Sequence, residues 1–211
     1  MKIAIIDYGI GNVRSILGAF ENQDADVLLT NNKDEILKSD GLVLPGVGAF
    51  SHGMENLISY DLVDVIKEYV ALDRPLIGIC LGMQLLFEES EEFGKTEGLG
   101  LILGKVVKLP TKDNQNENLP HVSWNKLNSN KVPWKNTILA DTEEGSDMYF
   151  VHSFVAQPRD SYNILSLTEY LNYHFCSSVK KGNIYGCQFH PEKSGPTGLK
   201  IINNFIRMCE A

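Results

Sequence analysis

The sequence is short of the features that mark secreted, metal-binding and membrane proteins. No Cys-x-x-Cys spacing occurs among its cysteines, which are Cys80, Cys176, Cys187 and Cys209. Such scatter predicts neither a disulfide framework nor a metal site, and it is typical of proteins of the reducing cytoplasm, where we expect this chain to work. The apolar run at the N-terminus ends at Asp7, which is too short for a signal peptide, and no apolar stretch approaches the length of a membrane span.

Positive charge is also in short supply. The 19 lysines and arginines stand against 27 aspartates and glutamates, which gives a formal net charge of −8. An acidic chain without clustered Lys and Arg is not expected to bind nucleic acid. The 211 residues are enough for one sizeable core, and no shift in composition divides them, so the sequence predicts a single domain over residues 1–211.

Strand-like and helix-like patterns alternate along the first half of the chain. Short apolar runs predict strands at 2–7, 26–29, 41–44 and 76–80. Apolar residues at helical spacing predict helices at 13–20, 32–37 and 54–72, the last broken near 59–61. This alternation is typical of right-handed crossovers and a mostly parallel sheet.

The second half of the chain is richer in strand patterns. Strands are predicted at 105–109, 149–154, 164–170, 173–179 and 184–189, with a final helix at 197–209. The last three strands follow one another closely, so we expect them to be antiparallel and the whole sheet to be mixed. Residues 111–118 are polar and are predicted to be a loop. The polar and aromatic residues 121–125 are interpreted as a second loop.

A glycine-rich turn follows the first predicted strand. It contains Gly9 and Gly11, but it lacks both the third glycine of a dinucleotide-binding turn and the lysine of a phosphate-binding loop. No nucleotide cofactor is therefore expected at this turn.

The stretch from Pro75 to Leu86 places a cysteine between a buried strand and a helix, with no room for a loop. A thiol in that position lies at the positive end of the helix dipole, which favours the reactive thiolate. Gly78 and Gly82 flank Cys80, as expected where a strained backbone packs against other chain. The pattern matches the nucleophile elbow of Gly-x-Ser-x-Gly hydrolases with Cys in place of Ser. Considered alone, it fits a buried structural cysteine equally well.

A second turn, at residues 45–50, follows the strand predicted at 41–44. Its two glycines, Gly46 and Gly48, leave the backbone free to turn N–H groups outward. The turn is therefore a candidate segment for stabilising an oxyanion, although an ordinary tight turn explains the same residues.

Near the C-terminus, His190 and Glu192 stand two residues apart at a predicted strand end, so the carboxylate is placed to orient the imidazole. With Cys80 they supply the nucleophile, base and orienter of covalent acyl transfer. The turns at Val47 and Leu81 offer backbone N–H groups for the oxyanion. The side chains of Cys80, His190 and Glu192 all lie at the carboxyl ends of predicted strands, where ligands bind in parallel sheets.

Three motifs, in this order along the chain, carry a family resemblance. Residues 44–50 (Leu-Pro-Gly-Val-Gly-Ala-Phe), 78–84 (Gly-Ile-Cys-Leu-Gly-Met-Gln) and 188–194 (Gln-Phe-His-Pro-Glu-Lys-Ser) resemble the class I (triad) glutamine amidotransferases. Pro-Gly-Val-Gly, with residues 7–9 and 149–153, is similar to the glutaminase subunits of imidazole glycerol phosphate synthase. The resemblance spans nearly the whole chain. It implies a three-layer, flavodoxin-like α/β fold, with helices flanking a mixed, mostly parallel central sheet.

The resemblance also implies a role for each motif. Cys80 attacks the side-chain amide of glutamine, His190 protonates the departing ammonia and later activates water, and Glu192 holds His190. Val47 and Leu81 offer N–H groups to the oxyanion, the first after a turn flip triggered by the partner. The residues implied in holding glutamine are Gly46, Gly48, Gln84, His152, Ser153 and Phe154. Those implied at the partner interface are Asn12, Trp124, Tyr149 and Lys193.

The partner implied by the resemblance is a synthase subunit of (β/α)8-barrel type, which receives ammonia through an internal channel in a one-to-one heterodimer. No cofactor or metal is implied. In histidine biosynthesis the products are imidazole glycerol phosphate and aminoimidazole carboxamide ribotide.

The family usually shows His-Met-Gly-Trp-Asn, whereas this chain has Val122 and Ser123 at the second and third positions of that motif. The ammonia acceptor therefore stays open between the histidine pathway and an amidotransferase of surface-polysaccharide sugars. A non-catalytic regulatory subunit and a cysteine hydrolase or protease are further alternatives.

Overall fold

The computed structural model describes residues 1–110 and 119–210, so the polar loop predicted at 111–118 lies outside the described residues. The α-helices are α1 (Val13–Glu21), α2 (Lys33–Lys38), α3 (Phe50–Ser59), α4 (Leu62–Ala71), α5 (Leu81–Leu85) and α6 (Gly195–Cys209). Short 3₁₀ helices are η2 (Ser161–Asn163) and η3 (Pro191–Lys193). Within these described ranges, no helix is long and apolar enough to cross a membrane.

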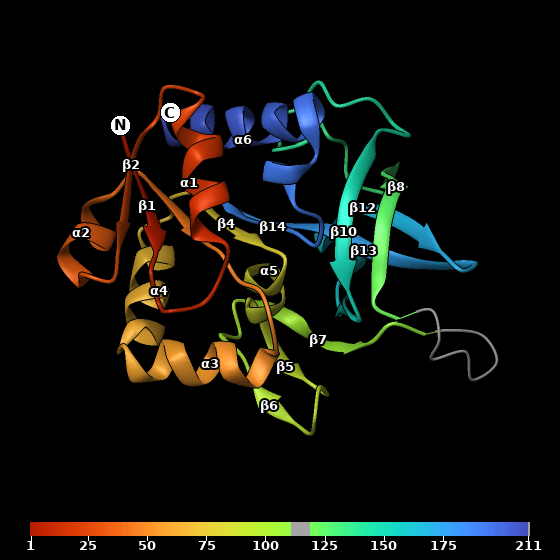
Figure 1. The fold of residues 1–211 in the computed structure, drawn as a ribbon, viewed down its shortest axis with the longest axis horizontal. Coiled ribbons are helices and arrows are strands. Elements are labelled where there is room, and N and C mark those ends of the chain that lie inside the picture. Colours follow the sequence, from red (N-terminus) through yellow and green to blue (C-terminus); the bar gives the residue numbers. More distant parts are fainter. Residues whose placement is uncertain (111–118, 211) are drawn as a thin grey trace.

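The central sheet runs in the order β2-β1-β3-β4-β14-β13-β12-β9 (Figure 1). Its strands are β1 (Lys2–Ile6), β2 (Asp26–Thr30), β3 (Gly41–Leu44), β4 (Leu76–Ile79), β9 (Asn128–Ser129), β12 (Ile164–Tyr170), β13 (Tyr173–Lys181) and β14 (Ile184–Cys187). The pairs from β2 to β14 are parallel, and those from β14 to β9 are antiparallel. The mixed, mostly parallel sheet predicted from the sequence is confirmed.

Helices cover both faces of this sheet, because its inner strands are apolar on both sides. Along β1, Ile3 and Ile5 pack into one core with residues of α1 and α6. Ala4 and Ile6 point to the opposite face and pack with residues of α2, α3 and α4. Figure 1 shows α1 and α6 on one side of the sheet and α3 and α4 on the other. The expected three-layer arrangement is therefore confirmed.

Two smaller sheets lie beside the central one and were not predicted. In one, β8 (His121–Lys126) pairs antiparallel with β10 (Asp147–His152). The other has the order β11 (Phe154–Pro158), β7 (Ile102–Lys108), β5 (Phe87–Ser90) and β6 (Thr96–Glu97). The single strand predicted at 149–154 is wrong, because β10 and β11 pair in different sheets and the chain changes sheet at Ser153.

The loop predicted at 121–125 is also wrong, since these residues form most of β8. The side chain of His121 is fully buried, whereas Val122 and Trp124 are 52% and 53% exposed. This alternation is that of a strand, but His121, Ser123 and Asn125 occupy the positions where apolar residues are expected. Their hydrogen bonds to one another replace apolar packing, so the usual sequence signal of a strand is missing.

Candidate active site

Cys80 lies in the turn between β4 and α5, at the carboxyl edge of the central sheet. Its backbone angles, φ 55° and ψ −110°, are costly for a residue with a Cβ atom. The neighbouring chain is tightly packed: a Cβ atom on Gly82 would lie 1.8 Å from the carbonyl oxygen of Leu44. One on Gly78 would lie 2.6 Å from the carbonyl oxygen of Gly82. Strand, strained turn and helix therefore follow one another as the motif predicts.

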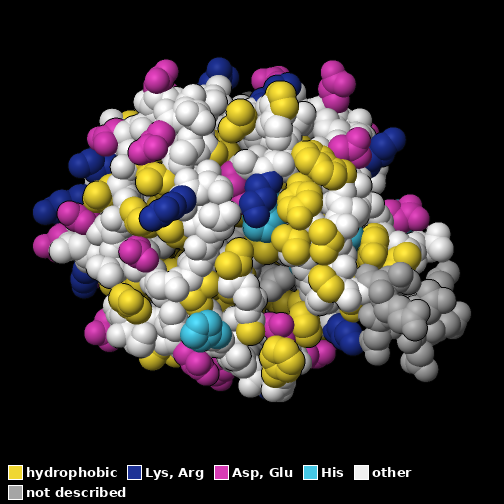
Figure 2. Space-filling view, in the orientation of Figure 1, with side chains coloured by type: hydrophobic (Ala, Val, Ile, Leu, Met, Phe, Trp, Pro, Cys, Tyr) yellow, Lys and Arg dark blue, Asp and Glu magenta, His cyan; other side chains and the backbone are white. Residues whose placement is uncertain are grey.

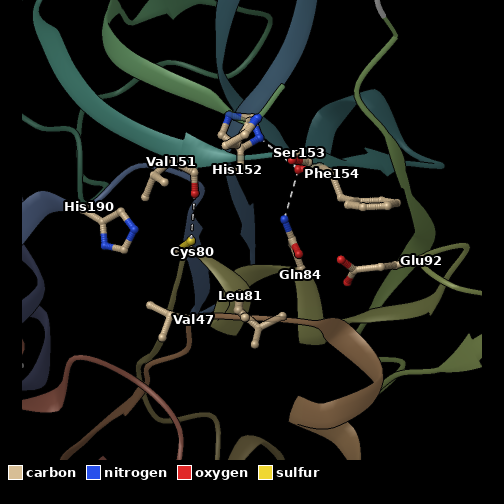
Figure 3. Close-up of a pocket in the computed structure, with 12 residues that line it drawn as sticks. Val47, Cys80, Leu81, Gln84, Glu92, Val151, His152, Ser153, Phe154 and His190 are labelled. Carbon is tan, nitrogen blue, oxygen red and sulfur yellow. Dashed lines mark hydrogen bonds between the residues drawn. The ribbon is translucent and has the colours of Figure 1, made fainter. Parts of the chain in front are cut away.

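His190 and Glu192 accompany this thiol. His190 Nδ1 lies 2.8 Å from Glu192 Oε1, and the two side chains are only 2% and 1% exposed. His190 Nε2 is buried and has no hydrogen-bond partner within the described residues. Cys80 and His190 line the same cavity, and Figure 3 shows them near each other at one end of it. The structure thus brings together the three residues expected to act as nucleophile, base and orienter.

The charge state of His190 follows from these neighbours. Burial by itself lowers the pKa of the imidazole, but the Cys80 thiolate and the Glu192 carboxylate together outweigh it and raise the pKa to about 9. His190 is therefore protonated at neutral pH. A protonated His190 places a positive charge and a proton donor beside Cys80 at one end of the cavity.

The cavity at Cys80 has a volume of about 240 Å³. The predicted site residues that line it are Val47, Gly48, Cys80, Leu81, Gln84, His152, Ser153, Phe154 and His190. Gly46 lies beneath it instead, where a Cβ atom would meet the Tyr8 hydroxyl at 2.8 Å and Leu81 Cβ at 2.9 Å. Over the described part of the chain, no cluster of His, Cys, Asp or Glu could hold a metal ion.

Gln84 projects from α5 into this cavity in a fixed orientation. Its Nε2 donates to the carbonyl oxygen of Phe154 at 3.0 Å and to Gln188 Oε1 at 2.9 Å. Both amide hydrogens are therefore already used in hydrogen bonds within the protein. Figure 3 shows the Gln84 oxygen on the side of the Glu92 carboxylate.

Glu92 is a cavity residue that sequence reasoning missed. Its Oε2 accepts the backbone N–H of Phe50 at 2.7 Å, which fixes the carboxylate at the cavity wall. Together with the Gln84 oxygen, it offers two acceptors and a negative charge to a ligand cation. The residue lies in the connection between β5 and β6, and no local pattern in the sequence marks that connection.

Two buried histidines, His152 in the cavity wall and His121 behind it, form a pair that was not predicted. His121 Nδ1 is 2.9 Å from His152 Nε2, and His152 Nδ1 is 2.9 Å from the carbonyl oxygen of Phe154. Burial lowers the pKa of His121, and burial together with the neighbouring His121 lowers the pKa of His152 to about 3. His152 is therefore neutral at physiological pH.

The residues expected at the partner interface lie outside the cavity. The rings of Trp124 and Tyr149 are 5.9 Å apart, and Lys193 Nζ lies 6.0 Å from the Tyr149 ring, which is itself 6.3 Å from that of His190. Asn12 is exposed at the start of α1, which packs against η3, the element that contains Lys193. Figure 2 shows hydrophobic side chains gathered over β8 and β10 on this face.

Comparison with known proteins establishes the class. The chain belongs to the class I glutamine amidotransferase family, whose model matches residues 4–209. A solved structure of a glutamine amidotransferase has the same fold, with a TM-score of 0.75 at 15% identity and 99% of each chain covered.

Relatives with higher sequence identity are named as subunits of one particular synthase. Imidazole glycerol phosphate synthase subunit HisH 1 of Legionella pneumophila (strain Lens) is 45% identical over 211 residues, covering 98% of this chain and 99% of that protein. The HisH subunit of the same synthase from Bacillus cereus (strain B4264) is 45% identical over 210 residues, covering 99% and 96%.

Proposed function

We propose that this chain is the glutaminase subunit of a two-subunit imidazole glycerol phosphate synthase, working as a single domain in the cytoplasm. It hydrolyses glutamine to glutamate and ammonia and delivers the ammonia to a (β/α)8-barrel partner in a heterodimer. Near-full-length similarity to HisH subunits supports the histidine-pathway assignment. The chemistry is carried by one observation: Cys80 and the His190–Glu192 pair meet at one cavity beside Gln84.

Glutamine enters this cavity with its side-chain amide toward Cys80. Its α-ammonium group binds between the carboxylate of Glu92 and the oxygen of Gln84, which are both acceptors. The backbone of Gly48 and of residues 152–154 holds the remaining polar groups of the substrate. The negative charge of Glu92 selects a zwitterionic amino acid over a neutral amide, because the carboxylate needs a cationic partner once water is displaced.

The reaction proceeds by covalent catalysis. The Cys80 thiolate attacks the amide carbon, and the N–H groups of Val47 and Leu81 stabilise the oxyanion that forms. The C–N bond breaks as His190 gives its proton to the nitrogen, and ammonia leaves. His190 then takes a proton from water, whose oxygen attacks the thioester carbon, and glutamate departs as the Cys80 thiolate is restored. Glu192 keeps the imidazole oriented throughout.

Partner docking uses the face that carries Trp124, Tyr149, Lys193 and Asn12. Exposed aromatic side chains such as Trp124 are typical of interaction surfaces, where they supply large contact areas. Tyr149 and Lys193 lie next to His190, so a partner on this face covers the site at which ammonia is released. Ammonia then moves into the barrel and not into solvent.

Reconstitution tests the assignment. The full chain is mixed with the barrel subunit of imidazole glycerol phosphate synthase, its cyclase substrate and glutamine, and glutamate and imidazole glycerol phosphate are measured. We expect both products in a one-to-one ratio, and neither with Cys80→Ala. The matched control is Cys176→Ala, which removes a buried thiol that does not line the cavity and should keep turnover.

Other outcomes separate the alternatives. Glutamate release with a sugar amidotransferase, but not with the histidine-pathway barrel, would assign ammonia to sugar amidation. Turnover that survives Cys80→Ala, or that is missing with every partner, would contradict the glutaminase assignment.

A further inference from the structure

A continuous chain of hydrogen-bonding groups runs from the glutamine cavity to β8. It begins at the carbonyl oxygen of Phe154 and passes through the rings of His152 and His121 at 2.9 Å per step. It ends at Ser123 and Asn125: His121 Nε2 lies 2.9 Å from Ser123 Oγ and 2.8 Å from Asn125 Oδ1. The two rings face each other because β8 and β10 pair His121 with His152 in register.

The inner end fixes the direction of these hydrogen bonds. The carbonyl oxygen of Phe154 can only accept, so the neutral ring of His152 carries its hydrogen on Nδ1 and donates to that oxygen. His152 Nε2 is then an acceptor, and His121 Nδ1 donates to it. At the outer end, the hydroxyl of Ser123 donates to Asn125 Oδ1.

Asn125 has a fixed orientation at the outer end. Its Nδ2 donates to the carbonyl oxygen of Glu169 at 3.1 Å, which turns Oδ1 toward Ser123 and His121. At the inner end, His152 has one defined tautomer, and its Nε2 accepts from His121 Nδ1.

The inner end of this hydrogen-bond chain determines which atom of the Gln84 amide faces the substrate site. The carbonyl oxygen of Phe154 accepts from His152 and also from Gln84 Nε2 at 3.0 Å. Holding that oxygen in place keeps the nitrogen of Gln84 turned away from the cavity and its oxygen turned in. The Gln84 oxygen is then available beside Glu92 for the α-ammonium group of glutamine.

The ring of His121 is held by packing as well as by hydrogen bonds. It stacks on Tyr170 at 3.9 Å and on Phe150 at 5.2 Å between ring centroids. Any test must therefore separate the hydrogen bond from the stacking.

We infer that His121 is a positioning residue of the glutamine site, acting through His152 and Phe154 on Gln84. The inference rests on the proposed function for its substrate. It gives a role to a histidine that does not itself line the cavity.

Two substitutions of His121 separate the two roles. His121→Phe keeps a flat ring between Tyr170 and Phe150 but cannot donate to His152. His121→Asn loses the ring, but its amide nitrogen can donate from the place of Nδ1. With the full chain bound to its barrel partner, we expect His121→Phe to raise the KM for glutamine about tenfold, with a smaller change in kcat, and His121→Asn to restore most of the loss.

A packing role predicts the opposite order, with His121→Phe tolerated and His121→Asn impaired, and that result would overturn the inference. The control is His174→Phe, at an exposed position on β13, which should leave KM unchanged.

Nitrogen NMR of histidine-labelled full chain tests the tautomers without any substitution. We expect the hydrogen of His152 on Nδ1 throughout pH 6–8, and a hydrogen on Nδ1 of His121 as well. A His152 hydrogen on Nε2 in the unsubstituted chain would overturn the inference. If the unsubstituted complex shows no glutaminase activity, the proposed function fails, and the NMR result still decides the direction of the hydrogen-bond chain.

Discussion

Cys80 keeps a side chain at backbone angles that favour glycine, and this conflict is typical of a functional site. We predict that Cys80→Gly is more stable than Cys80→Ala by about 1 kcal/mol in free energy of unfolding, although glycine is the more flexible residue when unfolded. Both variants lose the thiol and should lose glutamine turnover. They should therefore differ in stability but not in activity. Urea unfolding of the two variants measures the difference, and equal midpoints would argue against backbone strain.

The raised pKa of His190 leads to a second prediction at the residue scale. An unfolded histidine titrates near pH 6.5, whereas His190 titrates at about 9. The stability that protonated His190 contributes is therefore complete below about pH 6.5 and is lost as the pH rises through about 9. Above that pH the neutral ring also has no proton to give to ammonia, so we expect kcat/KM for glutamine to fall with a midpoint near 9.

Glu192, the hydrogen-bond partner of His190, allows a check on the predicted dependence of kcat/KM on pH. Glu192→Gln removes the negative charge that helps to raise the pKa, so the alkaline limb measured between pH 6 and 10 should move to lower pH. An alkaline limb at the same pH in both proteins would mean that another group titrates. Activity should fall as well, because the amide orients the imidazole less well.

Site residues that lie in a dense local motif were predicted, whereas site residues that only the tertiary fold brings to the site were not. Cys80 and His190 are recognisable because neighbouring glycines, or a carboxylate two positions away, give their chemistry a local context. Glu92 and His121 have no such context. Glu92 reaches the cavity through the connection between β5 and β6, and His121 reaches the cavity residue His152 through the register of β8 with β10. Only tertiary structure shows these placements.

At the scale of elements, the parallel half of the fold was easier to predict than the polar strands. β3 was predicted to the residue, because four consecutive buried residues lie between turn signals. β8 has polar residues facing inward and was taken as a loop. The division between β10 and β11 at Ser153 was missed, since nothing in a continuous strand-like run marks the point where its pairing partner changes.

Packing of α5 against β3 gives a prediction for that pair of elements. Gly82→Ala would place a methyl group 1.8 Å from the carbonyl oxygen of Leu44, so the start of α5 must move. We expect the free energy of unfolding to fall by at least about 2 kcal/mol. Glutamine turnover should fall too, because Cys80 and Leu81 move with the helix.

Gly18 in α1 is the matched control. Nothing lies within 4 Å of the position that its Cβ atom would occupy, and its backbone is helical. Gly18→Ala should therefore raise the free energy of unfolding by about 0.5 to 1 kcal/mol. Guanidinium unfolding compares the two variants, and a Gly82→Ala protein as stable as the unsubstituted chain would contradict the close approach of α5 to β3.

At the scale of the whole molecule, the two edges of the central sheet that lie at the ends of its strands carry different residues. The edge at which β3, β4 and β14 end carries Cys80, the turn at residues 45–48 and His190, and the small sheet of β8 and β10 lies beside it. The opposite edge carries the turns that lead into these strands, including the end of α4. Because chemistry and exposed aromatic residues share one edge, a partner that binds there can both cover the cavity and receive ammonia.

Docking on that edge yields the last prediction. Trp124 is 53% exposed on β8 and contacts Tyr149, so its truncation removes a large aromatic surface without opening the core. We expect Trp124→Ala to weaken binding of the barrel subunit by about 2 kcal/mol, or roughly 30-fold in Kd. Leu72→Ala is the control, since Leu72 is 48% exposed at the C-terminal end of α4, on the opposite edge. Calorimetric titration of the barrel into each variant measures both affinities. Equal loss in the two variants would mean a general change in the fold, and no loss at Trp124 would place the partner on another face.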